Sequence, residues 1–338
     1  MKQTLKDLTR KSVFLSMMLL ACSGIFAKSK TKWAVNPELP MSVRMCQSEI
    51  IRNPEGWMLD FSTKLKWNYC HGLECQAFLD VYDRYGGDYL YKYVKQFADT
   101  MINENGRIYG YKKTNYNLDH VNSGKILFRL YEREKDPRYK IAMDTLRAQL
   151  ASQPRTSDGG FWHKKIYPYQ MWLDGIYMGS PFYAQYAATF NEPEDFADVV
   201  SQFLIIAKHT YDKKTGLYRH AWDEIKALPW SDLKTGQAPH VWGRALGWYM
   251  MAIVDALDFI PENQPGRDKM ILILNDLVKI LPKYQDQRTG AWYQVVDMPE
   301  REGNYLEMSC TPMYAYAIAK GVRKGYLPEK SLSIAQKA

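Results

Sequence analysis

The sequence predicts an all-α fold in which helical hairpins form a closed ring around a central funnel. Apolar residues recur at helical spacing along most of the chain after residue 40, and strand-like alternation is nearly absent. One kind of aromatic loop also returns after a helix, at intervals close to 55 residues. Because a hairpin cannot bury its apolar face alone, its neighbours must stack on it. The repeat is longer than that of common open solenoids, and long loops can gather at one mouth of a ring.

Apolar periodicity marks the helices in chain order. It predicts helices over 72–85, 121–131, 176–190, 196–211, 245–260, 270–284 and 313–322. The recurring loops are marked by Gly106, Gly160, Gly216 and Gly290, at intervals of 54, 56 and 74 residues. The longer third interval predicts an insertion around 227–239. After 322 only a short stretch over 329–338 remains for a helix, so we expect the last hairpin to be incomplete.

The N-terminus has the pattern of an export signal. A basic segment precedes a short apolar run over 13–21, which is about half the length of a membrane-spanning helix. Cleavage before Cys22, with a lipid on that cysteine, and simple cleavage after Ala27 both stay open, as does an uncleaved anchor. We expect a signal peptide over 1–27, a linker over 28–40 and a single domain over 41–338. The protein would then be periplasmic or lipid-anchored to the bacterial envelope.

Charge and composition narrow the class of partner. The formal net charge is +8, and removal of residues 1–21 leaves +5 with the basic residues scattered. Nucleic-acid binding is therefore not expected. Aromatic residues reach 14%, which suits a surface that stacks on sugars. The cysteines and six histidines match no metal-binding spacing, and no nucleotide-binding fingerprint is present.

The densest polar and aromatic cluster surrounds Asp174. It runs from Trp162 to Gly179 and places Asp174 at the start of a predicted helix. Such a position also suits a simple helix cap. However, Trp172 and Met178 flank the carboxyl, and a desolvated carboxyl has a raised pKa. The cluster therefore favours Asp174 as a general acid.

A second carboxylate occupies the equivalent place one repeat earlier. Asp119 also opens a predicted helix and lies 55 residues before Asp174, which is the length of the repeat. Equivalent positions in neighbouring hairpins can meet at one rim. Enzymes that act on sugars commonly use two carboxyl groups in a cleft as general acid and general base. Two independent helix caps are the alternative.

Basic and aromatic groups complete the candidate site. His163 and His220 end two equivalent aromatic loops, 57 residues apart. Arg244 lies one helical turn before Trp248 and two residues after Trp242. Arginine can bind a carboxylate through two parallel hydrogen bonds, and tryptophan can stack on a sugar face. Each histidine alone is as readily structural.

These motifs resemble glycoside hydrolase family 105, the unsaturated rhamnogalacturonyl hydrolases. The resemblance covers residues 40–325 and rests on three ordered motifs with similar spacing. They are Leu118-Asp119 with Asn122 and Gly124, Trp172-Leu173-Asp174 with Tyr177-Met178-Gly179, and Trp242-x-Arg244 with Gly247-Trp248. The related family 88 unsaturated glucuronyl hydrolases share the fold and the use of two aspartates in the active site. The resemblance implies an (α/α)6 barrel with no metal or organic cofactor.

The resemblance also implies the reaction and the residues. The substrate would be an oligosaccharide from a pectin lyase, with a 4,5-unsaturated galacturonyl residue at its non-reducing end. Asp174 would protonate C4 and activate the water that adds at C5, with Asp119 assisting. The remaining implied residues would line the uronate site: Tyr69, His163, Trp172, Met178, His220, Arg244 and Trp248.

Two alternatives and one departure remain open. The substrate could instead carry an unsaturated glucuronyl residue, as in products of glycosaminoglycan cleavage, or the funnel could only bind oligosaccharide. Gly175 follows Asp174 where a polar residue is common in the family, so we expect the local hydrogen bonding to differ. The neighbouring sugar and the oligomeric state do not follow from the sequence.

Overall fold

The structure, a computed structural model, describes residues 35–338. They fall into two compact units, one ending at Arg52 and one comprising Asn53–Ala338. The first contains helix α2 (Met41–Arg52). The predicted signal peptide over 1–27 and most of the linker over 28–40 lie outside the described residues. The single domain over 41–338 stays a prediction.

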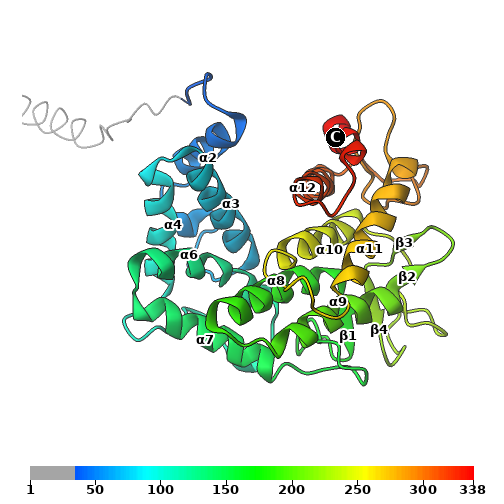
Figure 1. Cartoon of the computed structure of the whole chain (residues 1–338), viewed down its shortest axis with the longest axis horizontal. Coiled ribbons are helices and arrows are strands. Elements are labelled where there is room, and N and C mark those ends of the chain that lie inside the picture. The colour runs from blue at the N-terminus through cyan, green and yellow to red at the C-terminus, as the bar shows by residue number, and fades with distance from the viewer. Residues whose placement is uncertain (1–34) are drawn as a thin grey trace, which may run out of the picture. The chain divides into compact units, whose positions relative to one another are not determined.

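The unit Asn53–Ala338 is a succession of helical hairpins, each with an inner and an outer helix. The inner helices are α3 (Tyr69–Tyr85), α6 (Lys125–Glu134), α8 (Leu173–Phe190), α10 (Gly243–Ala256) and α12 (Cys310–Arg323). The outer helices are α4 (Asp88–Met101), α7 (Pro137–Ala151), α9 (Asp195–Thr210), α11 (Arg267–Ile280) and α13 (Leu332–Lys337). Each inner helix packs on the outer helix that follows it and on the next inner helix. Figure 1 shows these pairs following one another around an arc in chain order. The predicted all-α ring of hairpins is confirmed, and its last hairpin ends in the short helix α13.

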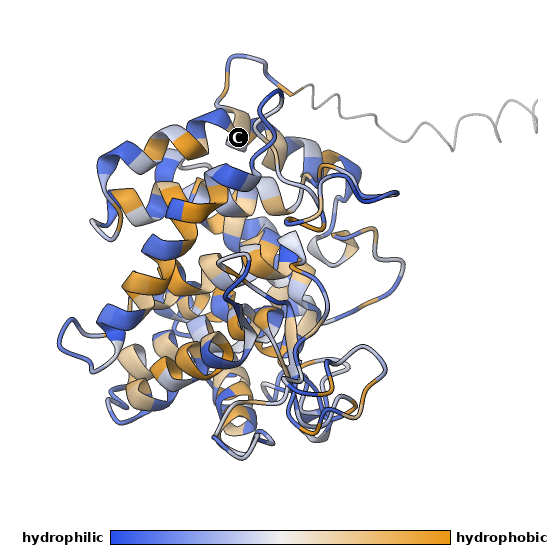
Figure 2. Ribbon diagram, turned by 90° about the vertical axis from the view of Figure 1, so that its right-hand side faces the viewer, coloured by the Kyte–Doolittle hydropathy of each residue, from blue (hydrophilic) through white to orange (hydrophobic). Residues whose placement is uncertain are grey.

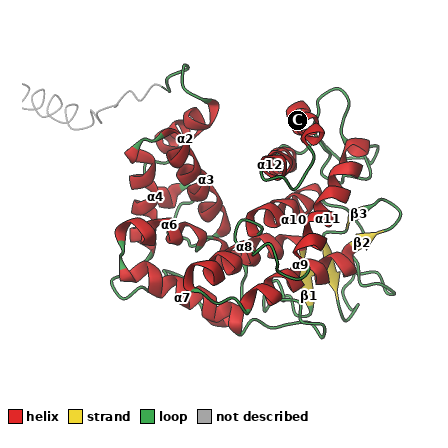
Figure 3. Ribbon diagram, in the orientation of Figure 1, coloured by secondary structure: helices red, strands yellow, loops and turns green. Residues whose placement is uncertain are grey.

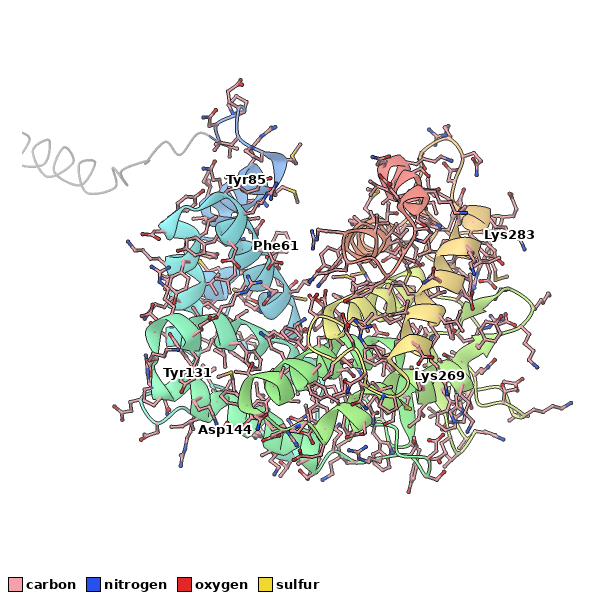
Figure 4. The ribbon with its side chains drawn as sticks, viewed as in Figure 1. Phe61, Tyr85, Tyr131, Asp144, Lys269 and Lys283 are labelled. Atoms are coloured by element: carbon pink, nitrogen blue, oxygen red, sulfur yellow. The ribbon has the colours of Figure 1, made fainter. Side chains whose placement is uncertain are left out.

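Burial explains why these segments form helices. The inner helices α8 and α10 carry buried residues on nearly every side, because each has an outer helix behind it and inner helices beside it. The outer helices α4, α7, α9 and α11 bury residues mainly on one face. Figure 2 shows both apolar and polar residues along individual helices. Polar contacts join the two layers. Tyr186 on α8 donates a hydrogen bond of 2.6 Å to Asp144 on the outer helix α7. Figure 4 labels Asp144 among the side chains of the unit.

The observed helices correct the sequence prediction in two ways. The outer helices α4 and α7 were not among the predicted ones, although their buried residues recur at helical spacing. The single helix predicted over 121–131 is interrupted, forming α5 (Asp119–Asn122) and then α6. The break lies at Ser123, where Gly72 of α3 comes so close that an added Cβ would stand 2.4 Å from the Ser123 Cα. Ser123 also donates to the Asn68 carbonyl oxygen at 2.6 Å, which ties this break to the start of α3.

Short strands join the aromatic loops, a feature that the sequence did not indicate. β1 (Gln170–Trp172) pairs antiparallel with β4 (Ala221–Asp223), and Trp172 lies opposite Ala221. β2 (Tyr211–Asp212) pairs with β3 (Leu217–Tyr218). Figure 3 shows that these strands are small elements in a helical unit. Single-turn 3₁₀ helices occur at Gly56–Met58, Lys113–Asn115, Leu281–Tyr284 and Glu329–Ser331.

The repeated glycine loops share one backbone conformation. Gly106, Gly216 and Gly290 have φ values of 73°, 76° and 77°, in the left-handed region that favours glycine. In the second loop this conformation belongs to Gly159, with φ 96°, and not to Gly160. The repeat predicted from sequence is therefore real, with a one-residue shift in that loop.

The inner helices enclose a cavity of about 490 Å³, lined by residues of α3, α6, α8, α10 and α12. Lys125 of α6 and Tyr177 of α8 lie on its wall, with the lysine Nζ 3.8 Å from the centre of the tyrosine ring. Over residues 35–338, no helix combines the length and the apolar character needed to cross a bilayer.

Candidate active site

One backbone hydrogen bond recurs at the starts of α5, α8 and α10. The residue just before each candidate polar group donates its N–H to a carbonyl in the next aromatic loop. These bonds join Leu118 to His163 (3.2 Å), Leu173 to His220 (2.9 Å) and Gly243 to Gln294 (2.7 Å). The residues that follow the donors are Asp119, Asp174 and Arg244. The three therefore occupy equivalent positions in consecutive repeats, which explains how groups distant in sequence reach one rim.

The helix ends contribute to the electrostatics of this rim. Tyr69, Asp174 and Arg244 lie in the first turns of α3, α8 and α10. The N-terminal end of a helix carries a partial positive charge and unpaired N–H groups. Several such ends around one rim favour a negatively charged ligand.

Asp174 is an unsatisfied carboxyl. It is the second residue of α8, which begins after Trp172, so it is not the helix cap. Its side chain is partly exposed, yet Oδ2 is buried and has no hydrogen-bond partner. Desolvation raises the pKa of Asp174 to about 7, with the negative charge of Asp119 adding to the shift and Arg244 opposing it. The carboxyl is therefore close to half protonated at neutral pH.

Asp119 differs from Asp174 because it has a cation beside it. It is buried and is the first residue of α5, after the cap residue Leu118. Lys164 Nζ lies 2.5 Å from its Oδ2, and His163 Nε2 lies 3.4 Å from its Oδ1. The two aspartates thus have different surroundings, because Asp119 lies beside a cation and Oδ2 of Asp174 has no hydrogen-bond partner.

His163 is held in a stack of rings. It is 2% exposed, and its ring lies 4.7 Å from that of Trp172 with 8° between the planes. Tyr167 covers the same tryptophan at 4.9 Å. Burial lowers the pKa of His163 to about 4, which outweighs the effect of Asp119. His163 is therefore neutral at pH 7 and does not contribute a charge.

His220 lies on the other side of Trp172. The two rings meet edge to face at 6.0 Å, and Trp230 and Trp242 approach the imidazole at 6.3 Å and 5.9 Å. Burial lowers the pKa of His220 to about 4. Trp230 belongs to the insertion that the sequence predicted over 227–239. The insertion thus adds an aromatic ring to the site.

Arg244 is the partly free cation of the site. Its side chain is 39% exposed, and its guanidinium carbon lies 4.6 Å from the ring centre of Trp242. One nitrogen, Nη1, lies 3.2 Å from Oε1 of the buried Glu307. An arginine held on one edge and one face has donors left for a ligand carboxylate.

The remaining predicted residues are Tyr69, Met178 and Trp248. Trp248 contacts Tyr69 edge to face at 6.0 Å and Tyr177 at 4.7 Å. Trp248 is 3% exposed and Met178 is 2% exposed. Burial raises the pKa of the Tyr69 hydroxyl, and the charges of Asp119 and Arg244 also act on it, so Tyr69 lies among the polar groups. Trp248 and Met178 are therefore almost fully buried, and their contact with substrate stays a prediction.

Two polar residues of the site were not found from the sequence. Lys164 directly follows His163, and a lysine at the end of an aromatic loop was the available signal. Glu307 lies three residues before α12, but no spacing connects it to Arg244, which is 63 residues earlier. Within residues 35–338 no group of three or more histidine, cysteine, aspartate or glutamate residues is arranged to hold a metal ion.

A ring of helical hairpins with two aspartates and an arginine at equivalent helix starts is an arrangement typical of glycoside hydrolases. The chain belongs to Glycosyl Hydrolase Family 88, whose family model matches residues 41–338. A solved family 105 glycoside hydrolase of C. acetobutylicum ATCC 824 is 43% identical and superimposes with a TM-score of 0.83, covering 88% of this chain and 81% of its own. The resemblance stated from the motifs and the barrel fold are confirmed. The family also implies an oligosaccharide substrate.

Two curated relatives are similar over smaller shares. Protein Atu3128 of Agrobacterium fabrum is 35% identical over 150 residues, which cover 44% of this chain and 63% of that protein. The chain therefore matches less than two thirds of the length of that relative. The unsaturated rhamnogalacturonyl hydrolase YesR of Bacillus subtilis is 24% identical over 264 residues, covering 76% of this chain and 72% of YesR.

Proposed function

We propose that the protein removes the 4,5-unsaturated galacturonyl residue from the non-reducing end of rhamnogalacturonan or pectin oligosaccharides made by lyases. The observation that carries this proposal is the contrast between the two aspartates. Asp174 has an unpartnered buried oxygen and a pKa near 7, while Asp119 is paired with Lys164. The similarity to YesR supports the choice of a galacturonyl substrate.

The proposed reaction begins with proton transfer. Protonated Asp174 gives its proton to C4 of the vinyl ether, and positive charge develops at C5 and the ring oxygen. The resulting Asp174 carboxylate then accepts a proton from a water molecule as its oxygen bonds to C5. Asp119, held beside Lys164, helps to place the water and stabilises the positive charge.

The hydrated product breaks down without a further catalytic group. Water addition leaves a hemiketal at C5, which opens as the C5–O bond of the ring breaks. C1 then carries both a hydroxyl and the neighbouring sugar, and this hemiacetal releases the sugar as an alcohol. Because cleavage follows hydration, the separation of the carboxylates does not predict retention or inversion as it does for ordinary glycosidases.

Recognition of the uronate would rest on Arg244 and on the helix ends. A guanidinium can bind a carboxylate through parallel hydrogen bonds, and the ends of α3, α8 and α10 favour an anion. Trp172 and His220 would border the sugar ring. A neutral sugar at the same place would lose the interaction with Arg244.

The test is loss of the ultraviolet absorbance of the conjugated double bond. The protein is mixed in parallel with unsaturated rhamnogalacturonan disaccharide and unsaturated glycosaminoglycan disaccharide. We expect decay with the first. Decay with the second alone would establish the glucuronyl alternative, and binding without decay of either would establish a sugar-binding protein.

We also infer a role in pectin breakdown outside the cytoplasm. Support comes from the sequence of residues 1–27 alone, with its basic segment, apolar run and Cys22. Mass spectrometry of the mature protein tests this inference. A lipid-modified N-terminal Cys22 or a new N-terminus after Ala27 would support export, and an intact N-terminus in the cytoplasm would contradict it.

A further inference from the structure

Glu307 is a buried carboxylate next to the arginine of the site. It is 4% exposed, and its Oε1 receives the Arg244 contact at 3.2 Å together with a hydrogen bond from the Ser309 hydroxyl. The other oxygen, Oε2, is buried and has no hydrogen-bond partner. A buried carboxylate with an unsatisfied oxygen costs free energy, so packing alone does not account for it.

The backbone around Glu307 is fixed before any ligand binds. Its N–H donates to the Trp292 carbonyl oxygen at 2.8 Å. Its own carbonyl oxygen accepts from the Thr311 hydroxyl at 3.0 Å and from the Cys310 thiol at 3.3 Å. Trp292 is fully buried. The carboxylate is therefore presented from a rigid turn at the start of α12.

Arg244 by itself is not rigid. Its side chain is 39% exposed, and an arginine has several rotatable bonds whose freedom is lost on binding. Trp242 holds one face of the guanidinium and Glu307 holds Nη1. A guanidinium has five N–H donors, so these contacts leave donors on its other edge. Because the guanidinium of Arg244 is held in place before the ligand arrives, less conformational entropy is lost when it binds a carboxylate.

We propose that Glu307 is a positioning residue that holds Arg244 ready for the carboxylate of the substrate. The inference rests on the proposed function, because it assigns Arg244 to the uronate. Glu307 acts through Arg244 and does not touch the sugar. Its negative charge cannot attract an anionic substrate, so Glu307 helps binding only by fixing the position of the Arg244 guanidinium. The length of the Glu307 side chain must therefore matter more than its charge.

The experiment uses a charged and a neutral version of one substrate. Unsaturated rhamnogalacturonan disaccharide is compared with its methyl ester, in which the uronate carries no charge. We expect Glu307→Ala to raise KM for the acid about tenfold, with kcat changed less than about threefold and the ester unaffected. Glu302→Gln, on the exposed part of the same loop, serves as the control and should match the parent protein. An equal loss for acid and ester would overturn the proposal.

Two conservative variants distinguish the effect of side-chain length from the effect of charge. They also show whether a loss of activity comes from misfolding. Glu307→Gln keeps the length of the side chain, and we expect KM for the acid to stay within about threefold of the parent value. Glu307→Asp keeps the charge but shortens the side chain, and we expect a loss close to that of Glu307→Ala. A normal KM for Glu307→Asp with a raised one for Glu307→Gln would contradict the proposal.

A double-mutant cycle tests whether Glu307 acts through Arg244. Arg244→Ala alone and Arg244→Ala with Glu307→Ala should have the same KM for the acid, because the second change removes nothing more. A further tenfold loss in the double variant would overturn the proposal. If the parent protein turns over neither disaccharide, the proposed function fails, and calorimetry with galacturonate and its methyl ester replaces kinetics. Weaker binding of galacturonate alone by Glu307→Ala would still uphold the inference, and no binding by the parent protein would overturn both.

Discussion

Gly175 lies directly against the imidazole of His163. A Cβ placed on Gly175 would stand 2.8 Å from Nδ1 of His163 and 3.2 Å from Cδ1 of Leu118. The histidine cannot easily move, because it is 2% exposed and stacked on Trp172. Gly175 therefore makes room for the ring that borders Asp119.

Gly175→Ala should consequently destabilise the protein and impair the site. Helix propensity alone predicts that alanine inside a helix gains about 1 kcal/mol over glycine, so a loss would show that the clash dominates. Overpacking of this kind costs about 1–3 kcal/mol. We expect a lower free energy of unfolding in urea and a lower kcat/KM, since His163 would be pushed against Asp119.

Gly179→Ala is the matched control for this change. Gly179 lies one turn further along α8, and its added Cβ would meet Leu118 Cδ2 at 3.4 Å, an ordinary contact. We expect this variant to be as stable as the parent protein or slightly more stable. Equal effects of the two alanines would show that the contact with His163 is not the cause.

The pKa of Asp174 predicts how activity depends on pH. The proposed proton transfer to C4 needs the protonated carboxyl, and burial raises the pKa of Asp174 to about 7. We expect kcat/KM to fall about tenfold per pH unit once the pH exceeds that value. Lys164→Met should move the inflection to higher pH, because the lysine charge lowers the pKa of Asp174. A flat profile between pH 6 and 9 would reject Asp174 as the acid.

Asp174→Asn separates catalysis from stability. We expect turnover to be abolished while oligosaccharide binding stays measurable. The carboxyl has a higher pKa folded than unfolded, about 7 against 3.8. Folding therefore retains a proton that the unfolded chain releases, and stability is lost as pH rises through this window. Three pKa units correspond to about 4 kcal/mol.

The stability gain of Asp174→Asn should accordingly depend on pH. At pH 8 we expect it to be more stable than the parent protein by up to about 4 kcal/mol, and near pH 4 the difference should be small. Urea unfolding at both pH values measures this. Full activity of Asp174→Asn would show that Asp174 is not the proton donor, and a constant stability difference would show that burial does not control its pKa.

The sequence predicted positions that obey a repeat and missed contacts that do not. Asp119 and Asp174 could be matched because each follows a residue that bonds to the next aromatic loop. Because each repeat contains this hydrogen bond at the same position, the two aspartates are separated by one repeat length in the sequence. The contact between Arg244 and Glu307 depends on how α10 and the start of α12 pack, which no local pattern records. The break between α5 and α6 has the same origin, because Gly72 approaches Ser123 from another helix.

Lys125 makes a prediction that is independent of catalysis. It is 5% exposed on the wall of the central cavity, and its contact with Tyr177 is a cation–π interaction at 3.8 Å, with no carboxylate of the described residues within ion-pair distance. Burial lowers the pKa of Lys125 from 10.5 to about 8. Below pH 8 the folded state therefore contains a buried charged lysine, which lowers the free energy of unfolding. Between about pH 8 and 10.5 the lysine is neutral in the folded state and charged in the unfolded state, so the free energy of unfolding should rise with pH.

Lys125→Met should therefore stabilise the protein at pH 7 by up to about 3 kcal/mol, less the loss of the contact with Tyr177. The gain should shrink when urea unfolding is repeated at pH 10. Lys320→Met is the matched control, because Lys320 lines the same cavity but lies 2.7 Å from both Asp255 and Asp258. Its removal leaves two carboxylates without that partner, so we expect destabilisation. Destabilisation of similar size in both variants would show that the charge of Lys125 is compensated as fully as that of Lys320.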